Sequence, residues 1–283
     1  MENYGGNFRN LRKERGFTLK SVSENIISYS YLSKFENGKS DITLSNFTRL
    51  LERLNITLDE FLYFNEAQIP SYIQLLNKLV KPYAENNIKE LMKYYDEERD
   101  LYQQTNISYH NYNRIMIAAL IKDLDSNFKI DQVDINFYVD YLFNCSYWST
   151  YEVSLFGNAL FLFTEESLLL LVNEVKIRLN EYKVAQRNIR DLISLIENAC
   201  LILLRKKNVE KAKELSVFLE SHLSSKHYFE KTRKLFIDGI ILIGEEKIAE
   251  GVQKAQEAIN VMHSIDRRFA LNHEKELKFF VEK

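Results

Sequence analysis

The spacing of apolar and polar residues is helical almost throughout the chain and separates a short N-terminal part from a longer C-terminal part. Between residues 7 and 64, apolar positions three and four apart predict five short helices. Their buried faces are marked in order by Phe8 and Leu11, by Val22, by Leu32 and Phe35, by Phe47, Leu50, Leu51 and Leu54, and by Phe61 and Leu62.

Capping signals set the ends of these helices. Thr18 is a suitable N-cap for the second helix, which we expect to reach Ile26. The third and fourth helices are predicted over about residues 29–36 and 45–54. The sequence TLDE at residues 57–60 forms a capping box that opens the fifth helix.

Longer helical patterns follow one another from residue 72 to the C-terminus. The segment 66–71 is the expected linker, because Pro70 disfavours helix at the residue before it. Turns expected near Lys207-Asn208 and Ile243-Gly244 are about 36 residues apart, a spacing typical of helical-hairpin repeats. Steps of four and three residues, typical of a helix packed along one face, connect Ile248, Val252, Ala255, Ile259 and Met262.

These patterns predict an all-α protein with a five-helix domain at residues 1–65 and, at residues 72–283, a solenoid of helical hairpins. The composition agrees, because 283 residues with only 8 Gly and 2 Pro hold too few breakers for the many turns of an all-β fold. Stacked hairpins form a curved body whose concave face suits an extended ligand.

Charge and cysteine content narrow the class of protein. A net charge of −2 excludes a polybasic nucleic-acid coat but permits a small DNA-reading module on a neutral body. The two cysteines, Cys145 and Cys200, lie far apart in apolar surroundings, which is typical of free thiols in a reducing compartment. Without an apolar signal region or an apolar run of about 20 residues, we expect a cytoplasmic protein with no membrane partner.

The third predicted helix carries polar side chains opposite its apolar ones. With Val22 of the preceding helix packed against Leu32 and Phe35, it fits the second helix of a helix-turn-helix, which enters the major groove of DNA. Lys34 can donate to guanine, and hydroxyls can contact base edges or phosphates. Alone, such a segment is more often a solvated helix of a bundle, but the five-helix context favours a DNA-reading face made of Tyr29, Ser30, Ser33 and Lys34.

The turn after this helix suits a phosphate. Gly38 lets the chain leave the helix in the left-handed conformation, so that Asn37, Lys39 and Ser40 can contact the DNA backbone. The first helix adds a basic patch opposed only by Glu14, made of Arg9, Arg12, Lys13 and Arg15. The predicted DNA-binding residues are Arg12, Thr18, Tyr29, Ser30, Ser33, Lys34, Asn37, Lys39 and Ser40; Arg12 is also expected to pair with Glu36.

Two blocks of the chain resemble a known family. The sequence FRNLRKERGFTLKSVSENI together with YLSKFENGKSDITLSNFTRLLERLNITLDEFL resembles the phage-repressor (XRE-type) helix-turn-helix, and more narrowly the N-terminal domain of the Rgg/GadR/MutR regulators of low-GC Gram-positive bacteria. Residues 141–160, YLFNCSYWSTYEVSLFGNAL, are similar to the family signature W-x-x-Y-E-x-x-L-F-G-N. The resemblance covers nearly the whole chain.

This resemblance implies a homodimeric transcription factor with a tetratricopeptide-like domain, which in relatives binds short secreted signalling peptides after their import. Two departures are visible. Some relatives carry a crosslinking cysteine after the glycine turn, and residues 42–45 contain none, which excludes that covalent dimer. Relatives often have Lys and Gln where this chain has Tyr29 and Tyr31, so the operator sequence does not carry over from the resemblance.

Amides inside apolar helical stretches are candidates for binding such a peptide. Asn144, Asn158 and Asn198 can donate to and accept from a peptide backbone, or each can bond the main chain of a neighbouring helix. Arg187 and Arg190 can meet a peptide carboxylate or form a solvated face. The predicted ligand-binding residues are Asn158, Arg190 and Asn198.

No catalytic, metal or cofactor motif is found. The five histidines form no H-E-x-x-H pair, and no glycine-rich phosphate loop or nucleophile elbow occurs, so we expect no enzyme and no cofactor. Two functions remain: a peptide-controlled, sequence-specific DNA-binding regulator, or a helical-repeat interaction scaffold whose N-terminal bundle binds protein. The basic first helix beside a polar third helix favours the regulator.

Overall fold

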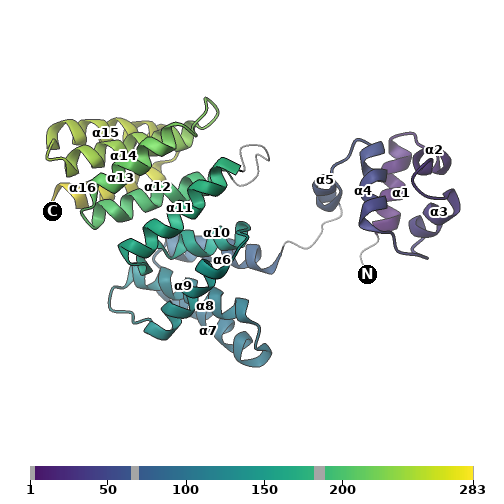
Figure 1. Cartoon of the computed structure of the whole chain (residues 1–283), viewed down its shortest axis with the longest axis horizontal. Coiled ribbons are helices and arrows are strands. Elements are labelled where there is room, and N and C mark those ends of the chain that lie inside the picture. Colours follow the sequence, from purple (N-terminus) through teal and green to yellow (C-terminus); the bar gives the residue numbers. More distant parts are fainter. Residues whose placement is uncertain (1–3, 65–69, 182–188, 283) are drawn as a thin grey trace. The chain divides into compact units, whose positions relative to one another are not determined.

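The computed structural model describes residues 4–64, 70–181 and 189–282, and these residues form helices joined by turns, with no strand among them. The chain divides into two compact units, residues 1–74 and residues 75–283 (Figure 1). The predicted all-α class is confirmed.

The first unit is a bundle of five short helices around an aromatic core. Phe8, Leu50 and Phe61 are fully buried, and the rings of Phe47 and Phe61 pack edge to face with centroids 4.8 Å apart. The predicted five-helix domain is confirmed, and its helices are α1 (Tyr4–Glu14), α2 (Leu19–Ser23), α3 (Tyr29–Glu36), α4 (Leu44–Arg53) and α5 (Leu58–Phe64).

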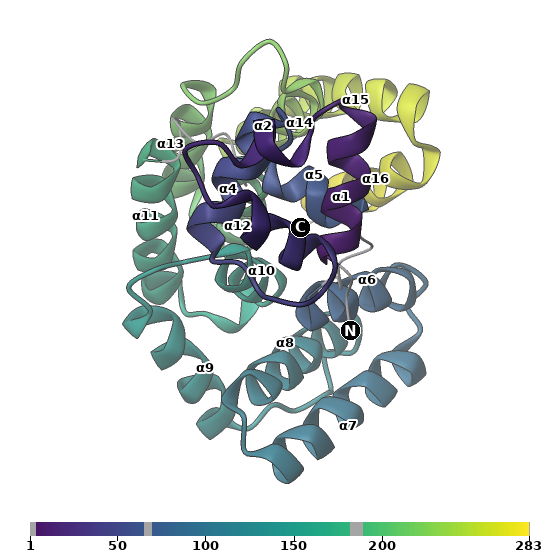
Figure 2. The same cartoon turned by 90° about the vertical axis from the view of Figure 1, so that its right-hand side faces the viewer.

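The second unit continues with helices packed mostly on their neighbours along the chain. Pairs such as α7 with α8 and α14 with α15 form antiparallel hairpins (Figures 1 and 2). The helices are α6 (Ser71–Ala84), α7 (Ile88–Thr105), α8 (Ser108–Leu124), α9 (Gln132–Asn144), α10 (Thr150–Asn158), the 3-10 helix η1 (Leu160–Leu162), α11 (Glu165–Glu181), α12 (Ile189–Arg205), α13 (Val209–Glu220), α14 (Tyr228–Gly244), α15 (Ile248–Ile265) and α16 (Arg267–Val281). Of the linker expected at residues 66–71, residues 66–69 lie outside the described residues.

Three hairpins turn by the same backbone device. Two residues after the first helix of each ends, the chain takes a positive φ, at Asn86 (54°), Lys207 (64°) and Glu246 (67°). The next N–H then bonds a carbonyl five residues back, at 2.8 Å, 2.9 Å and 3.0 Å respectively, which is a Schellman motif. The shared turn supports the helical-hairpin repeat that the spacing predicts.

The turn expected at Ile243-Gly244 lies two residues later than predicted. Gly244 is still helical, and a Cβ there would come within 2.7 Å of a methyl group of Val209. This glycine therefore permits close packing of α14 on α13 instead of forming the turn.

Candidate functional site

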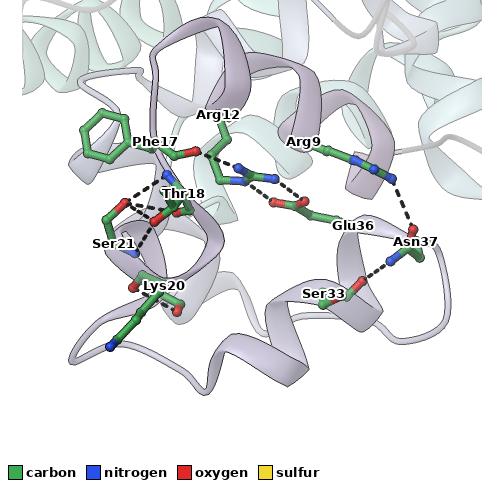
Figure 3. Close-up of polar contacts among 10 residues, drawn as sticks. Arg9, Arg12, Phe17, Thr18, Lys20, Ser21, Ser33, Glu36 and Asn37 are labelled. Atoms are coloured by element: carbon green, nitrogen blue, oxygen red, sulfur yellow. Dashed lines mark hydrogen bonds and ion pairs between the residues drawn. The ribbon is translucent and has the colours of Figure 1, made fainter.

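Side-chain caps fix the starts of α2 and α3. The Thr18 hydroxyl accepts from the Ser21 N–H at 3.0 Å, and the Ser21 hydroxyl accepts from the Thr18 N–H at 3.0 Å (Figure 3). Ser28 caps α3 by accepting from the Tyr31 N–H at 3.2 Å. Between the two helices Val22 and Leu32 are fully buried, which packs α2 against α3 as in a helix-turn-helix.

The outer face of α3 carries most of the predicted reading residues. Tyr29 is 62% exposed, Ser30 and Lys34 are exposed, and Ser33 is half-buried. The Tyr31 hydroxyl instead donates to the Asp41 carbonyl at 2.7 Å and so ties α3 to the following loop. The exposed face therefore offers hydroxyls and one cation, the groups that can read base edges.

The residue after α3 links this helix to α1. Asn37 donates through Nδ2 to the Ser33 carbonyl at 2.6 Å and accepts through Oδ1 from Nη1 of Arg9 at 3.2 Å (Figure 3). Gly38 then takes a φ of 68°, as the sequence predicts. Arg9 and Asn37 thus contribute to the position of α3 as well as to the polarity of its surface.

The two residues that follow Gly38 differ in exposure. Lys39 is exposed, and its N–H bonds the Lys34 carbonyl at 2.8 Å. The Ser40 hydroxyl is buried and has no hydrogen-bond partner in the described part of the chain. The expectation that this hydroxyl contacts a phosphate is corrected, because the side chain points into the fold.

Arg12 lies inside the first unit. Its guanidinium meets the Glu36 carboxylate through Nε at 2.6 Å and Nη2 at 2.8 Å, and Nη1 donates to the Phe17 carbonyl at 2.6 Å (Figure 3). The two side chains are only 6% and 2% exposed. The expected ion pair is confirmed, but the expectation that Arg12 contacts DNA is corrected, because its donors are used within the fold.

Two arginines of α4 hold the end of α2, and sequence reasoning missed both. Arg49 donates to the Asn25 carbonyl at 2.9 Å, and Arg53 donates to the Val22 carbonyl at 3.3 Å. Cations are favourable at a helix C-terminus, where carbonyls lack partners. The available signal was a pair of basic residues four apart on the fourth predicted helix.

The second unit contains a pocket of about 260 Å³ formed by side chains of α6, α8, α10, α12 and α16, with η1. It brings together two of the three predicted ligand-binding residues, Asn158 and Asn198. Its polar lining consists of Tyr83, Asp123, Asn158, Asn198, Arg205 and Glu276.

Two polar pairs lie in the wall of this pocket, and neither was found from the sequence. Arg205 binds both carboxylate oxygens of Glu276, at 3.0 Å and 2.6 Å. The Tyr83 hydroxyl donates to Asp123 at 2.5 Å, and burial, with the Asp123 charge, raises the pKa of Tyr83 above its usual value. These four residues come from helices far apart in sequence, so no local pattern connects them.

The two asparagines are held by different partners. Asn158 donates through Nδ2 to the Ser154 carbonyl at 2.8 Å, within α10. Asn198 accepts through Oδ1 from Nη2 of Arg233 at 2.7 Å, and Nη1 of Arg233 donates to Glu197 at 2.7 Å. Glu197 is fully buried, and burial raises its pKa to about 7.

The remaining ligand candidates do not join the pocket. Arg190 is 73% exposed with its Nε 3.5 Å from Glu230 and does not line this pocket, so its contact with a peptide carboxylate stays a prediction. Asn144 is exposed and bonds the Asp140 carbonyl, so it is not a buried amide. Arg187 lies outside the described residues.

Among the described residues, no three His, Cys, Asp or Glu side chains are grouped so that they could hold a metal ion. None of the helices searched over the same residues combines the length and the apolar character needed to cross a bilayer.

Comparison with known families defines the class of protein. The model of the HTH-type transcriptional regulator Rgg, C-terminal domain, matches residues 91–275, and a helix-turn-helix model matches residues 8–61. The chain therefore belongs to the Rgg family of HTH-type transcriptional regulators. The resemblance seen in the sequence and the prediction that the protein is not an enzyme are both confirmed by this membership.

Solved structures share the fold along the whole chain. A predicted transcriptional regulator from Listeria monocytogenes EGD-e is similar with a TM-score of 0.83 at 23% identity, covering 99% of this chain and 98% of its own. The Streptococcus dysgalactiae SHP pheromone receptor Rgg2 is similar with a TM-score of 0.79 at 23% identity, covering 97% and 98%. A PrgX/iCF10 complex follows with a TM-score of 0.71 at 14% identity, covering 99% and 96%.

Proposed function

We propose that residues 1–65 bind duplex DNA with α3 in the major groove. The observation that supports this most directly is the capped helix α3, which buries Leu32 and exposes Tyr29, Ser30 and Lys34. Lys34 donates to a base edge in this proposal, and the polar groups around the helix contact phosphates. Those surrounding residues are Thr18, Ser33, Asn37 and Lys39.

The protein acts as a cytoplasmic homodimer in this proposal, with residues 72–283 forming the dimer contact. A single reading helix touches only a few base pairs, so adequate specificity requires two half-sites. Symmetric homodimers are the commonest soluble oligomers, and they match operators with two-fold symmetry.

A short, mostly apolar peptide binds the pocket that contains Asn158 and Asn198 and controls DNA binding. Support comes from the paired amides in a partly apolar pocket and from the fold shared with a pheromone receptor, Rgg2, and with PrgX in complex with iCF10. A peptide can control DNA binding only if it binds one arrangement of the protein more tightly than another. Converting nearly all of the protein from one arrangement to the other requires a difference in binding free energy of about 5 kcal/mol.

A gel-shift assay against the chain's own upstream region tests the DNA-binding proposal. A discrete shift that weakens between about 50 and 200 mM salt is expected for phosphate contacts, and Lys34→Ala should weaken the shift and relax the sequence preference at one or two bases. Calorimetry with short hydrophobic peptides encoded in neighbouring reading frames tests the second proposal. Uniformly flat titrations would contradict peptide control and leave DNA binding standing.

A further inference from the structure

The amide of Asn198 has only one possible orientation. Its Oδ1 accepts from Arg233 Nη2 at 2.7 Å. A guanidinium has donors and no acceptor, so an amide turned the other way would place N–H against N–H. Asn198 lines the pocket and makes no other hydrogen bond to the described part of the chain, so the group it offers a ligand is the Nδ2 donor.

The amide of Asn158 is fixed in the opposite sense. Its Nδ2 donates to the Ser154 carbonyl at 2.8 Å, and a carbonyl can only accept. The group it offers the same pocket is therefore its Oδ1 acceptor. One pocket thus displays a donor from α12 and an acceptor from α10, and neither assignment depends on a choice of amide rotamer.

The glycine beside the acceptor is not required by close packing against any described residue. Gly157 lines the pocket, and a Cβ at this position would meet nothing within 4 Å. Glycine inside a helix is less favourable than alanine. An open wall of this kind lets a ligand backbone approach closely, which a side chain would prevent.

We propose that Gly157, Asn158 and Asn198 read the backbone of an extended peptide in one direction, with Arg233 as the positioning residue that orients the Asn198 amide. Asn158 accepts from a peptide N–H, and Asn198 donates to a peptide C=O. In an extended chain the N–H and C=O of one residue point to the same side, so reversing the chain would exchange donor and acceptor. This inference rests on the proposed peptide binding. It adds the direction in which the peptide lies and the residues that determine this direction.

Arg233 acts from behind the pocket. It does not line the cavity, its side chain is 11% exposed, and it is held by the fully buried Glu197. Two of its nitrogens have different tasks, because Nη1 pairs with Glu197 and Nη2 orients Asn198.

The test begins with the full-length chain and a pool of synthetic octapeptides randomised over Leu, Ile, Val, Phe, Trp and Ala. The peptide captured most strongly is resynthesised and titrated by calorimetry. If the wild-type chain captures nothing, the proposed peptide binding fails, and the directional reading fails with it.

Isosteric variants then separate the two amides. Asn198→Asp keeps an oxygen for Arg233 but replaces the outward donor by an acceptor, so affinity for the selected peptide should fall about 10-fold or more. Asn158→Asp loses the bond to the Ser154 carbonyl but keeps an outward acceptor, so its affinity should fall clearly less than that of Asn198→Asp. Equal losses in the two variants would overturn the inference.

Two further variants test the glycine and the positioning residue. Gly157→Ala should raise the thermal stability of the protein, because alanine is the better helix former. The same change should lower the affinity for the selected peptide. The double variant Glu197→Gln, Arg233→Met removes both buried charges and releases the Asn198 amide, so it should remain folded and bind about 10-fold more weakly.

A scan of the peptide backbone measures an effect that a purely structural role of Asn158 would not produce. Each N–H of the selected peptide is replaced in turn by an ester oxygen. One ester should lose affinity on the wild-type chain and cause no further loss on Asn158→Ala. Losses that are the same on both proteins, or unchanged affinity in Gly157→Ala, would overturn the proposal.

Discussion

Arg12 of α1 binds Glu36, the last residue of α3, through two hydrogen bonds of 2.6 Å and 2.8 Å, and both side chains are buried. The pair joins the basic first helix to the helix proposed to read DNA. The Glu36 carboxylate compensates the charge of Arg12, and the third nitrogen of the guanidinium, Nη1, donates to the Phe17 carbonyl. The position of α3 in the first unit therefore depends on an internal ion pair.

Removing one partner of this pair should destabilise the first unit strongly. Arg12→Met leaves Glu36 buried without a counter-charge, which costs about 3–5 kcal/mol. Hydrogen exchange followed by mass spectrometry should show faster exchange in α1 and α3, with α14 and α15 unchanged. The double variant Arg12→Met, Glu36→Leu should recover most of the protection, and a double variant as unprotected as the single one would contradict the account.

Two exposed lysines should affect DNA binding differently. Lys34→Ala should cost about 1–3 kcal/mol on the preferred sequence and relax specificity at one or two bases. Lys39→Ala should weaken all sequences alike and reduce the salt slope by about 1. Fluorescence anisotropy with permuted duplexes measures both effects.

The matched control is Lys231→Ala, an exposed lysine of the second unit, which should leave DNA affinity unchanged. Equal weakening of every sequence by Lys34→Ala would show that this residue contacts phosphates instead of bases.

The stability of the second unit should depend on the ionisation of Glu197. Burial raises its pKa from 4.5 to about 7 in the folded chain, with Arg233 opposing and Glu230 adding to the rise. The folded state thus holds this proton more tightly than the unfolded state. The resulting stabilisation is fully present below pH 4.5 and is lost as the pH rises to about 7, which amounts to about 3 kcal/mol.

Glu197→Gln removes this dependence because the amide does not titrate. Urea unfolding followed by the fluorescence of Trp148, the single tryptophan, reports on the second unit. The difference in unfolding free energy between wild type and variant should change between pH 4.5 and 7 and be constant above. A difference that is constant across this range would contradict the assignment.

Dimerisation should survive strong reductant. Cys200 is fully buried, and burial raises the pKa of its thiol, which keeps it protonated and unreactive. Cys145 is half-buried in the same unit and donates to the Tyr147 carbonyl at 3.0 Å. Light scattering of a Cys145→Ser, Cys200→Ala variant should give a dimer, and a monomer would contradict the proposed noncovalent contact.

Local signals predicted the first unit well because its helices begin at caps and end at turns that the sequence specifies. The third helix runs from Tyr29 to Glu36 as predicted, between the Ser28 cap and Gly38. The second helix ends at Ser23, short of the expected Ile26, because Asn25 takes a φ of 60°. That turn is held by arginines from α4, a tertiary contact that no local pattern contains.

The pocket could be predicted only in part. An amide within an apolar stretch marks a helix near the core, and Asn158 and Asn198 do line the pocket, while their contact with a ligand stays a prediction. The same pattern was wrong for Asn144, since apolar neighbours do not tell which side of a helix faces inward. The pairing of Arg205 with Glu276 joins residues 71 positions apart, which only the folded chain reveals.

The central claim is that α3 reads duplex DNA as half of a symmetric pair, and footprinting of the chain's upstream region tests it most directly. The account predicts two protected half-sites with centres about 34–36 Å apart or a multiple of that distance, and both should require a higher protein concentration in Lys34→Ala. Protection of a single site without a partner, or a footprint unchanged in Lys34→Ala, would contradict it.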